Sequence, residues 1–394
     1  MPRAALEVAD IFQRHGAEYR RRHRLPLPEL RVMRAIEACR TAALGGHVER
    51  CGHCDFTRIS YNSCRNRHCP KCQGMARAQW LQSRKAELLP VEYFHVVFTI
   101  PEELARIAFY NKEVVYGILF RAASETLLTI AADPKHLGAG IGFFAILHTW
   151  GQNLLHHPHV HCVVPGGGLS PDYDRWISCL PGFFLPVRVL SRLFRRLFLE
   201  ALERAFQNTD LVFFGDLEPL REAAEFTRYL APLRAAEWVV YCKPPFGGPQ
   251  RVLEYLGRYT HKVAISNRRI LSMHNGVVSF LWKDYRDGKS KVMAVTVEEF
   301  IRRFLIHTLP PGFPRIRYFG YLANRHRAGK LALCRQLLSA PVGALLPQPA
   351  DCRLMLQTFP GAPSWRCPQC QVGTMIRIGI TAAYRWPDKP PDSS

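Results

Sequence analysis

Acidic side chains are scarce in this chain of 394 residues. Its 32 Asp and Glu residues face 53 Lys and Arg residues, which gives a formal net charge of +21. This excess favours a polyanionic partner, and nucleic acid is the partner that we expect. An anionic membrane surface is disfavoured because no long basic amphipathic helix stands apart from the core pattern. A soluble protein that is merely basic is the alternative.

Export and membrane signals are missing as well. The first residues, MPRAALEVADIFQRHG, contain no uninterrupted apolar core and no small-residue cleavage site, so we expect no signal peptide. No apolar run approaches the length that spans a bilayer. Without an export signal, the 13 cysteines are expected to be metal ligands or reduced thiols, not a disulfide framework. These observations predict a cytoplasmic protein.

The sequence also lacks a regular βαβ repeat, a glycine-rich dinucleotide loop and any internal repeat. Strand-like segments such as YFHVVFTIP, GIGFFAILHTWG and HPHVHCVV are short and rich in β-branched or aromatic residues. Helical patterns cover about 102–132 and 187–206. Because strands and helices segregate in short runs, we predict an α+β fold with a central antiparallel sheet and flanking helices.

Two CxxC pairs occur in the segment CGHCDFTRISYNSCRNRHCPKCQG. Four thiolates on two adjacent turns can surround one zinc ion tetrahedrally and so fold a segment too small for its own core. Spacing leaves open whether Cys64 and His68 are supporting groups, substitute ligands or part of a second site. A third pair, Cys367 and Cys370, has no obvious partner pair, and zinc there is undecided. The predicted structural zinc ligands are Cys51, Cys54, Cys69 and Cys72.

Four histidines lie in the short segment HHPHVH. Because side chains alternate along a strand, His159 and His161 are expected on one face, with the valine between them turned into the core. Two imidazoles so placed can chelate one divalent ion, although structural histidines are the alternative. Gln152, at the end of the preceding strand, is our choice for a third ligand. His148 and His157 compete with it for that role.

The segment LEYLGRYTHK places two tyrosines four residues apart on a predicted helix, so Tyr255 and Tyr259 share a face. Packing in a core is the alternative. A tyrosine hydroxyl is a poor nucleophile at its free pKa of about 10. It becomes effective against a phosphodiester where a metal polarises the phosphate and cations absorb developing charge. The histidine pair offers that metal, so the two motifs explain each other.

Three stretches together carry a family resemblance: the knuckle CGHC…CRNRHCPKCQ, the segment HPHVHCVVPGGGL and the segment YLGRYTHKVAISNRRI. With these motifs the chain resembles the two-tyrosine rolling-circle transposases of bacterial insertion sequences, in the ninety-one family of the HUH endonuclease superfamily. FTIPEEL and YFGYLANRHR look like family sequence too. The resemblance covers nearly the whole chain and is weakest over the last fifty residues.

The resemblance implies a function and a mechanism. His159 and His161 would hold Mg²⁺ or Mn²⁺, and Tyr255 and Tyr259 would attack single-stranded DNA at transposon ends and target sites to give a 5′-phosphotyrosine and a free 3′-hydroxyl. Because no Walker-type phosphate loop occurs in the sequence, unwinding would come from a host helicase. Localisation would be the bacterial cytoplasm, at the nucleoid. A plasmid replication initiator or relaxase, or a non-catalytic zinc DNA-binding protein, is the alternative.

The resemblance also implies a domain order. We predict a helical zinc-binding, DNA-binding domain at 1–90, an HUH nuclease palm at 91–330, and a C-terminal appendage with a CxxC pair and a flexible tail at 331–394. Helix 187–206 and the stretch 315–327 are candidate contacts to the DNA backbone or, alternatively, solvated faces. The individual residues expected to bind DNA are Arg258, Lys262, Arg268, Arg269, Arg325 and Arg327.

Overall fold

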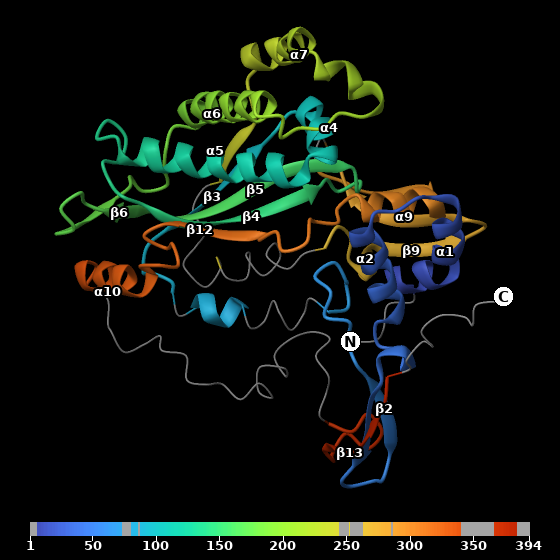
Figure 1. Ribbon diagram of the computed structural model, residues 1–394. Helices are drawn as coiled ribbons and strands as arrows, with labels where there is room; N and C mark the ends of the chain where they lie inside the picture. Colours follow the sequence, from blue (N-terminus) through green and yellow to red (C-terminus); the bar gives the residue numbers. More distant parts are fainter. Residues whose placement is uncertain are drawn as a thin grey trace. The chain divides into compact units, whose positions relative to one another are not determined.

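The computed structural model describes residues 6–72, 80–85, 87–243, 252, 263–284, 287–339 and 366–383 (Figure 1). The chain divides into two compact units that do not follow chain order. The first unit comprises residues 1–80, 261–308 and 348–394, and the second comprises 81–260 and 309–347. This division differs from the three consecutive domains expected from the sequence, because segments far apart in the chain pair and pack with one another within the first unit.

The second unit is built on a five-stranded antiparallel sheet in the order β12-β4-β5-β3-β8. The central strand β5 pairs with β3 on one side and with β4 on the other. The strands are β3 (Tyr93–Thr99), β4 (Gly142–Trp150), β5 (His156–Pro165), β8 (Val240–Lys243) and β12 (Ile316–Gly320). A separate small hairpin joins β6 (Gly167–Leu169) to β7 (Trp176–Ser178).

Helices cover one face of this sheet (Figure 1). Alternate residues of β5, namely Val160, Cys162 and Val164, are fully buried against the apolar faces of α5 and α6. Phe98 of β3 meets Phe194 of α6 with ring centroids 4.9 Å apart. The opposite face of the same strands therefore carries the intervening side chains, which include the histidines. The helices on this face are α4 (Glu102–Tyr110), α5 (Lys112–Ala132), α6 (Val187–Gln207) and α7 (Ala223–Ala235). Helix α10 (Arg327–Leu337) packs in a separate small core with Leu169 and Tyr321.

Helix α5 is apolar along most of its length, contrary to the expectation that no run approaches a bilayer-spanning length. By length and composition alone it is long and apolar enough to cross a membrane, but 67% of its apolar window is buried inside the protein. Its side chains pack against the sheet and against α6. A helix that is apolar on all sides is found in the core of a protein as well as in a membrane. Its burial therefore identifies α5 as a core helix.

The first unit contains two small three-stranded antiparallel sheets. One is a meander of β9 (Ile270–His274), β10 (Val277–Lys283) and β11 (Ser290–Thr296), and the expected hairpin turn at Asn275 and Gly276 has positive φ angles of 47° and 72°. The other has the order β13-β1-β2. Its strands are β1 (Gly46–Cys51), β2 (Thr57–Tyr61) and β13 (Met375–Thr381).

Among the described residues, three α-helices complete the first unit: α1 (Val8–Arg22), α2 (Leu27–Ala38) and α9 (Val297–Leu305). Phe12 of α1 meets Phe304 of α9 edge to face, with ring centroids 5.3 Å apart, and both rings are buried. Aromatic pairs of this kind add to the stabilisation from apolar burial. The predicted α+β fold, with antiparallel sheets, flanking helices and an N-terminal cysteine-rich region, is therefore confirmed.

His156, at the start of β5, is a core histidine. Its Nδ1 donates to the carbonyl oxygen of Ala105 (3.0 Å), and its Nε2 accepts from the hydroxyl of Tyr116 (2.7 Å). The pKa of His156 is lowered to about 3, mainly because the ring is buried. The ring is therefore neutral at physiological pH. Both ring nitrogens are thus occupied by protein partners, and His156 is positioned for packing.

We expect Tyr116→Phe to lower the free energy of unfolding by about 1–3 kcal/mol, because a buried acceptor on His156 loses its donor. Urea denaturation of the full chain measures this difference. Tyr110→Phe is the matched control: its side chain is 43% exposed, and we expect a change within about 0.5 kcal/mol. Equal effects of the two substitutions would contradict a structural role for the buried hydrogen bond.

Candidate functional site

Three imidazoles converge on the face of the second unit's sheet that lies opposite α5 and α6. His159 and His161 extend from β5, and His148 extends from β4, where its backbone lies opposite His159. One ring nitrogen of each residue lies within 4.8 Å of those of the other two. The ring centroids of His148 and His161 are 4.3 Å apart, and those of His159 and His161 are 4.8 Å apart. This spacing suits a single divalent ion held by three neutral imidazoles.

Hydrogen bonds to the Nδ1 atoms orient two of these rings. His159 Nδ1 donates to the carbonyl oxygen of His157 at 2.7 Å, which fixes the proton on Nδ1 and leaves the lone pair on Nε2. His161 Nδ1 lies 2.7 Å from Nε2 of His95. Ligation through Nε2 of His161 requires the proton on Nδ1, so His161 then donates to His95. Metal-binding histidines characteristically make such a bond through the second ring nitrogen.

His95, on β3, is the supporting residue that the sequence analysis missed. It is 2% exposed, and its ring stacks on His161 with centroids 4.9 Å apart. Burial, with smaller contributions from Lys243 and His159, lowers the pKa of His95 to about 3. The ring is therefore neutral, and its Nε2 can accept a hydrogen bond from Nδ1 of His161. Its signal was a single histidine inside the apolar segment YFHVVFTI, which by itself is more typical of a core residue.

The expected third ligand was Gln152, with two histidines as competitors. Gln152 lies in the turn that joins β4 to β5, whereas the structure brings the imidazole of His148 to the His159–His161 pair. The carbonyl oxygen of His157 accepts a hydrogen bond from His159, and the imidazole of His157 is not part of the cluster. The structure therefore groups His148 with the predicted histidine pair, and ligation by Gln152 stays a prediction.

An aromatic and basic rim adjoins the histidines. Trp150, at the end of β4, stacks on His148 with ring centroids 4.8 Å apart. The guanidinium of Arg315 lies over the Trp150 ring, 5.3 Å from its centroid. Trp150 and Arg315 are both half-buried. This pair places a flat ring and a positive charge beside the candidate metal ligands.

The cysteines of the first unit form two clusters, which corrects the predicted grouping. Cys51 and Cys54 lie together with Cys367 and Cys370, so they do not share an ion with the Cys69–Cys72 pair. The reason is the β1–β2 hairpin, whose strands separate its tip from its base by about 15 Å at 3.4 Å per residue. The tip carries the first CxxC pair, and the second pair follows the base. The cluster at the base consists of Cys39, Cys64, Cys69 and Cys72.

The base cluster has the geometry of a tetrathiolate site. The Sγ atom of Cys72 lies 3.4 Å from that of Cys39 and 3.5 Å from that of Cys64. Four thiolates around zinc, with Zn–S bonds of about 2.3 Å, have sulfur atoms about 3.8 Å apart. Cys39 ends helix α2, and the other three cysteines follow β2. The alternative left open for Cys64 is thereby decided in favour of a ligand position, whereas His68 belongs to neither cluster.

The predicted tyrosines and four of the predicted DNA-binding residues either belong to a different unit or lie outside the described residues. Tyr255, Tyr259, Arg258 and Lys262 lie outside the described residues. Arg268 and Arg269 belong to the first unit, in a 3₁₀ turn at Asn267–Arg269, where Nε of Arg269 donates to the carbonyl oxygen of Leu281 at 2.7 Å. Both arginines thus belong to a different unit from the histidine cluster.

In the second unit, Arg325 is exposed. Arg327 instead pairs with Glu87 at 3.3 Å and lies 5.1 Å over the ring of Tyr318, so it contributes to packing. Helix α6 presents arginines to solvent on the sheet face opposite the histidines. It can contact DNA only away from the histidine cluster. Its exposed arginines are Arg188, Arg192, Arg196 and Arg204.

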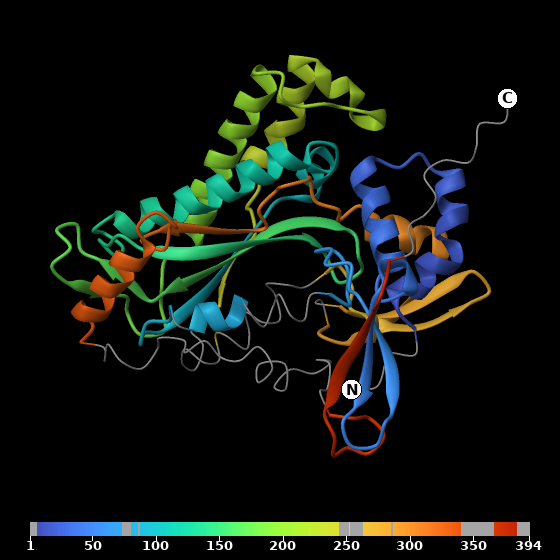
Figure 2. The same cartoon turned by 60° about the horizontal axis from the view of Figure 1, so that its bottom comes forward.

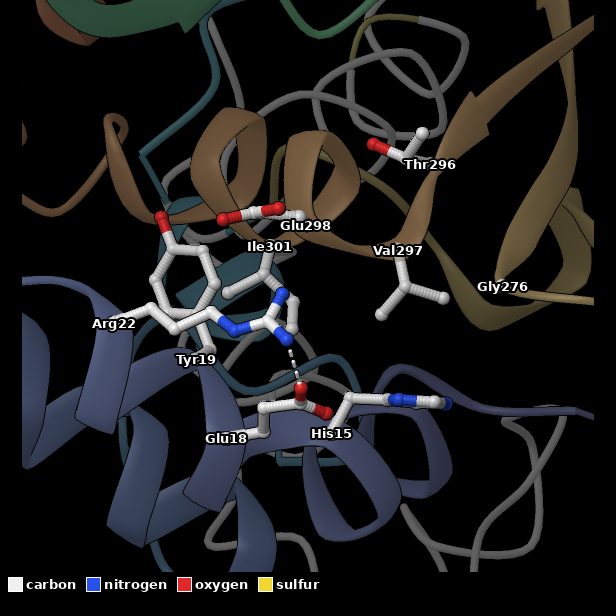
Figure 3. A pocket seen from close by; sticks show the side chains of 9 residues that line it. All are labelled: His15, Glu18, Tyr19, Arg22, Gly276, Thr296, Val297, Glu298 and Ile301. Carbon is white, nitrogen blue, oxygen red and sulfur yellow. Dashed lines mark ion pairs between the residues drawn. The ribbon is translucent and has the colours of Figure 1, made fainter.

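A small pocket of about 190 Å³ lies in the first unit between α1 and the start of α9 (Figure 3). Arg22 and Glu18 form an ion pair of 2.5 Å along its wall, as the dashed line in the figure shows. Burial and nearby carboxylates raise the pKa of Tyr19 to about 12, so its hydroxyl stays protonated. None of the predicted ligands or nucleophiles lines this pocket. We assign no catalytic role to it.

Comparisons with known proteins bear on both units. Residues 142–329 match a family model described as putative transposase, and residues 11–100 match one described as transposase zinc-binding domain. A putative transposase, y4qJ of Sinorhizobium fredii, is 61% identical over the full length of both chains. The transposase for insertion sequence element IS801 of Pseudomonas savastanoi is 28% identical over 75% of this chain and 71% of its own length. No solved structure matches the chain. The zinc-domain match and the cysteine clusters support structural zinc.

We expect Cys39→Ser to remove one zinc ion per chain, as Cys69→Ser does, because each substitution deletes one of the four thiolates at the hairpin base. The zinc content of the purified full-length protein, measured by elemental mass spectrometry, tests this expectation. Cys334→Ser is the control, since Cys334 is buried in α10 outside both clusters. Full zinc content in the Cys39→Ser protein would contradict the observed grouping.

Proposed function

Because the chain belongs to the IS91 family of insertion-sequence transposases, we propose that it nicks and rejoins single-stranded DNA at the ends of its element, driving rolling-circle transposition. The observation that carries this proposal is the cluster of His148, His159 and His161 on one face of the sheet. A transposase acts on DNA, and the net charge of +21 suits a polyanionic substrate.

The proposed nucleophiles are Tyr255 and Tyr259, which rest on the family resemblance. The phenolic oxygen of one tyrosine attacks the phosphorus, the 3′-oxygen of the DNA leaves and takes a proton, and a 5′-phosphotyrosine forms. The phosphodiester energy is kept in the new bond, so a 3′-hydroxyl can reverse the step without ATP. Two tyrosines allow a second strand to be cut while the first link persists.

The three imidazoles fit a resident divalent ion. His148, His159 and His161 would hold it, and when bound it would polarise the oxygens of the scissile phosphate. Three nitrogen donors suit Mn²⁺ at least as well as oxygen-preferring Mg²⁺. The carbonyl of His157 and the neutral ring of His95 keep the ligand rings in the tautomer that ligation needs. His95 is therefore a positioning residue and not a ligand.

The rim beside the histidines suits a flexible single strand. Trp150 offers a ring on which a base can stack, and the guanidinium of Arg315 offers a cation for a phosphate. Aromatic stacking combined with positive charge is how proteins hold single-stranded DNA without reading its sequence. This pair would orient the strand before attack.

The remaining parts of the proposal concern partners and place. The zinc-bearing first unit would bind the element's DNA ends, with the exposed Arg268 among its contacts. A host helicase would supply unwinding, and the protein would act in the bacterial cytoplasm at the nucleoid. A plasmid replication initiator or relaxase uses similar chemistry, but both family matches favour the transposase.

We expect a covalent protein–DNA adduct when the chain is incubated with single-stranded oligonucleotides from its own element's ends and Mn²⁺. Denaturing gels detect it. The double substitution Tyr255→Phe/Tyr259→Phe abolishes the adduct because both phenolic oxygens are gone, and Tyr110→Phe leaves it unchanged. If oligonucleotides from the element's own ends give no adduct with any divalent metal, the protein is not a tyrosine nuclease. That result would favour the alternative of a non-catalytic DNA-binding protein.

Substitutions in the histidine cluster separate ligation from positioning. We expect His148→Ala to abolish adduct formation at every Mn²⁺ concentration, because a ligand is lost. His95→Phe is expected to raise the Mn²⁺ concentration for half-maximal activity about 10–100-fold, while saturating Mn²⁺ restores the rate. Metal titrations of adduct formation measure both. The exposed His136 provides the control substitution His136→Ala. A His95→Phe protein with unchanged Mn²⁺ dependence would remove the positioning role.

A further inference from the structure

The cysteine cluster at the tip of the β1–β2 hairpin draws half of its members from the far end of the chain. The matched zinc-binding domain ends at residue 100 and so contains only the first pair. We propose that a second zinc ion joins the two chain ends at this tip, which makes residues 366–383 an integral part of the zinc-binding unit. Its four ligands are Cys51, Cys54, Cys367 and Cys370.

Sulfur distances at the tip support a tetrathiolate. Sγ of Cys51 lies 3.7 Å from that of Cys370, and Sγ of Cys54 lies 3.5 Å from that of Cys367. A disulfide would place two sulfur atoms about 2.05 Å apart, and all four cysteines are free thiols. Zinc ligands are expected about 3.8 Å apart, from Zn–S bonds of about 2.3 Å. The distances therefore match metal ligation and not oxidation.

Backbone amides point at the sulfur atoms of both pairs. The amide of His53 donates to Sγ of Cys51, and the amide of Gly373 donates to Sγ of Cys370, each at 3.3 Å. Amide donors stabilise the thiolate form, which is the form that binds zinc. Each CxxC turn therefore has one cysteine sulfur that accepts a hydrogen bond from a backbone amide of the same turn.

Gly373 allows the two turns to approach each other. A β-carbon at this position would lie 2.4 Å from Sγ of Cys51 and 2.6 Å from Cβ of His53. Neither neighbour can yield easily, because one is a ligand atom and the other is attached directly to the backbone of the CxxC turn. A side chain at residue 373 would therefore push the second pair away from the first.

Strand pairing carries the C-terminal segment to this tip. Strand β13 lies beside β1 along its whole length, from Gly46 opposite Thr381 to Cys51 opposite Met375 (Figure 2). Within the described part of the chain, the buried core at the tip consists of Cys51, Cys367 and Met375, and the residues packed against it are Cys54, Phe56 and Cys370. So few apolar side chains cannot hold a strand brought from the far end of the sequence, and a metal ion is the usual stabiliser of such small units.

The test counts zinc in the full-length protein. We expect two ions per chain in the wild type, one after Cys367→Ser/Cys370→Ser, and one after Cys51→Ser/Cys54→Ser. Combining all four substitutions should still leave one, because the two pairs share an ion. Cys179→Ser/Cys242→Ser, in the second unit, is the matched control and should keep two. The measurement requires no DNA, so its outcome is independent of the proposed nuclease chemistry.

Either of two measured zinc contents would overturn the proposal. One is a wild-type chain that holds a single zinc ion, and the other is full retention of zinc by Cys367→Ser/Cys370→Ser. Gly373→Ala guards against misfolding as an explanation, since it keeps every ligand. We expect a chelator to release one of its two ions at least tenfold faster than from wild type, with the other unchanged. Gly329→Ala, at a site with open space around it, is the control. Identical release from both variants would also contradict the shared site.

Discussion

The alternation of side chains along β5 is the constraint on which the second unit depends. Val160, Cys162 and Val164 must face α5 and α6 to close the core, and this forces His159 and His161 onto the other face. A shift of one residue would bury two imidazoles among apolar helices and expose three apolar side chains. The same burial that stabilises the sheet therefore fixes the direction of the candidate ligands, and flanking strands supply His148 and His95 at matching register.

The first unit depends on a different constraint. The tip and the base of its β1–β2 hairpin are too far apart for one group of cysteines to serve both, and a separate cysteine cluster lies at each end. The base cluster ties α2 to the segment after β2, and the tip cluster ties the hairpin to the C-terminal strand. Because neither end has a large apolar core, the thiolates replace hydrophobic burial as the source of order. This explains why so many cysteines occur in one small part of a chain that is otherwise held by aromatic and aliphatic packing.

The sequence predicted what local periodicity encodes and failed where distant segments meet. The period-two pattern placed His159 and His161 correctly, and the α+β class followed from short segregated elements. His95 was missed because a lone histidine in an apolar strand carries no spacing signal. The cysteines were grouped wrongly because a CxxC spacing reports a turn and not which other turn it faces. No pattern near Cys51 reveals that its partner is Cys370. The tyrosines remain a prediction from resemblance.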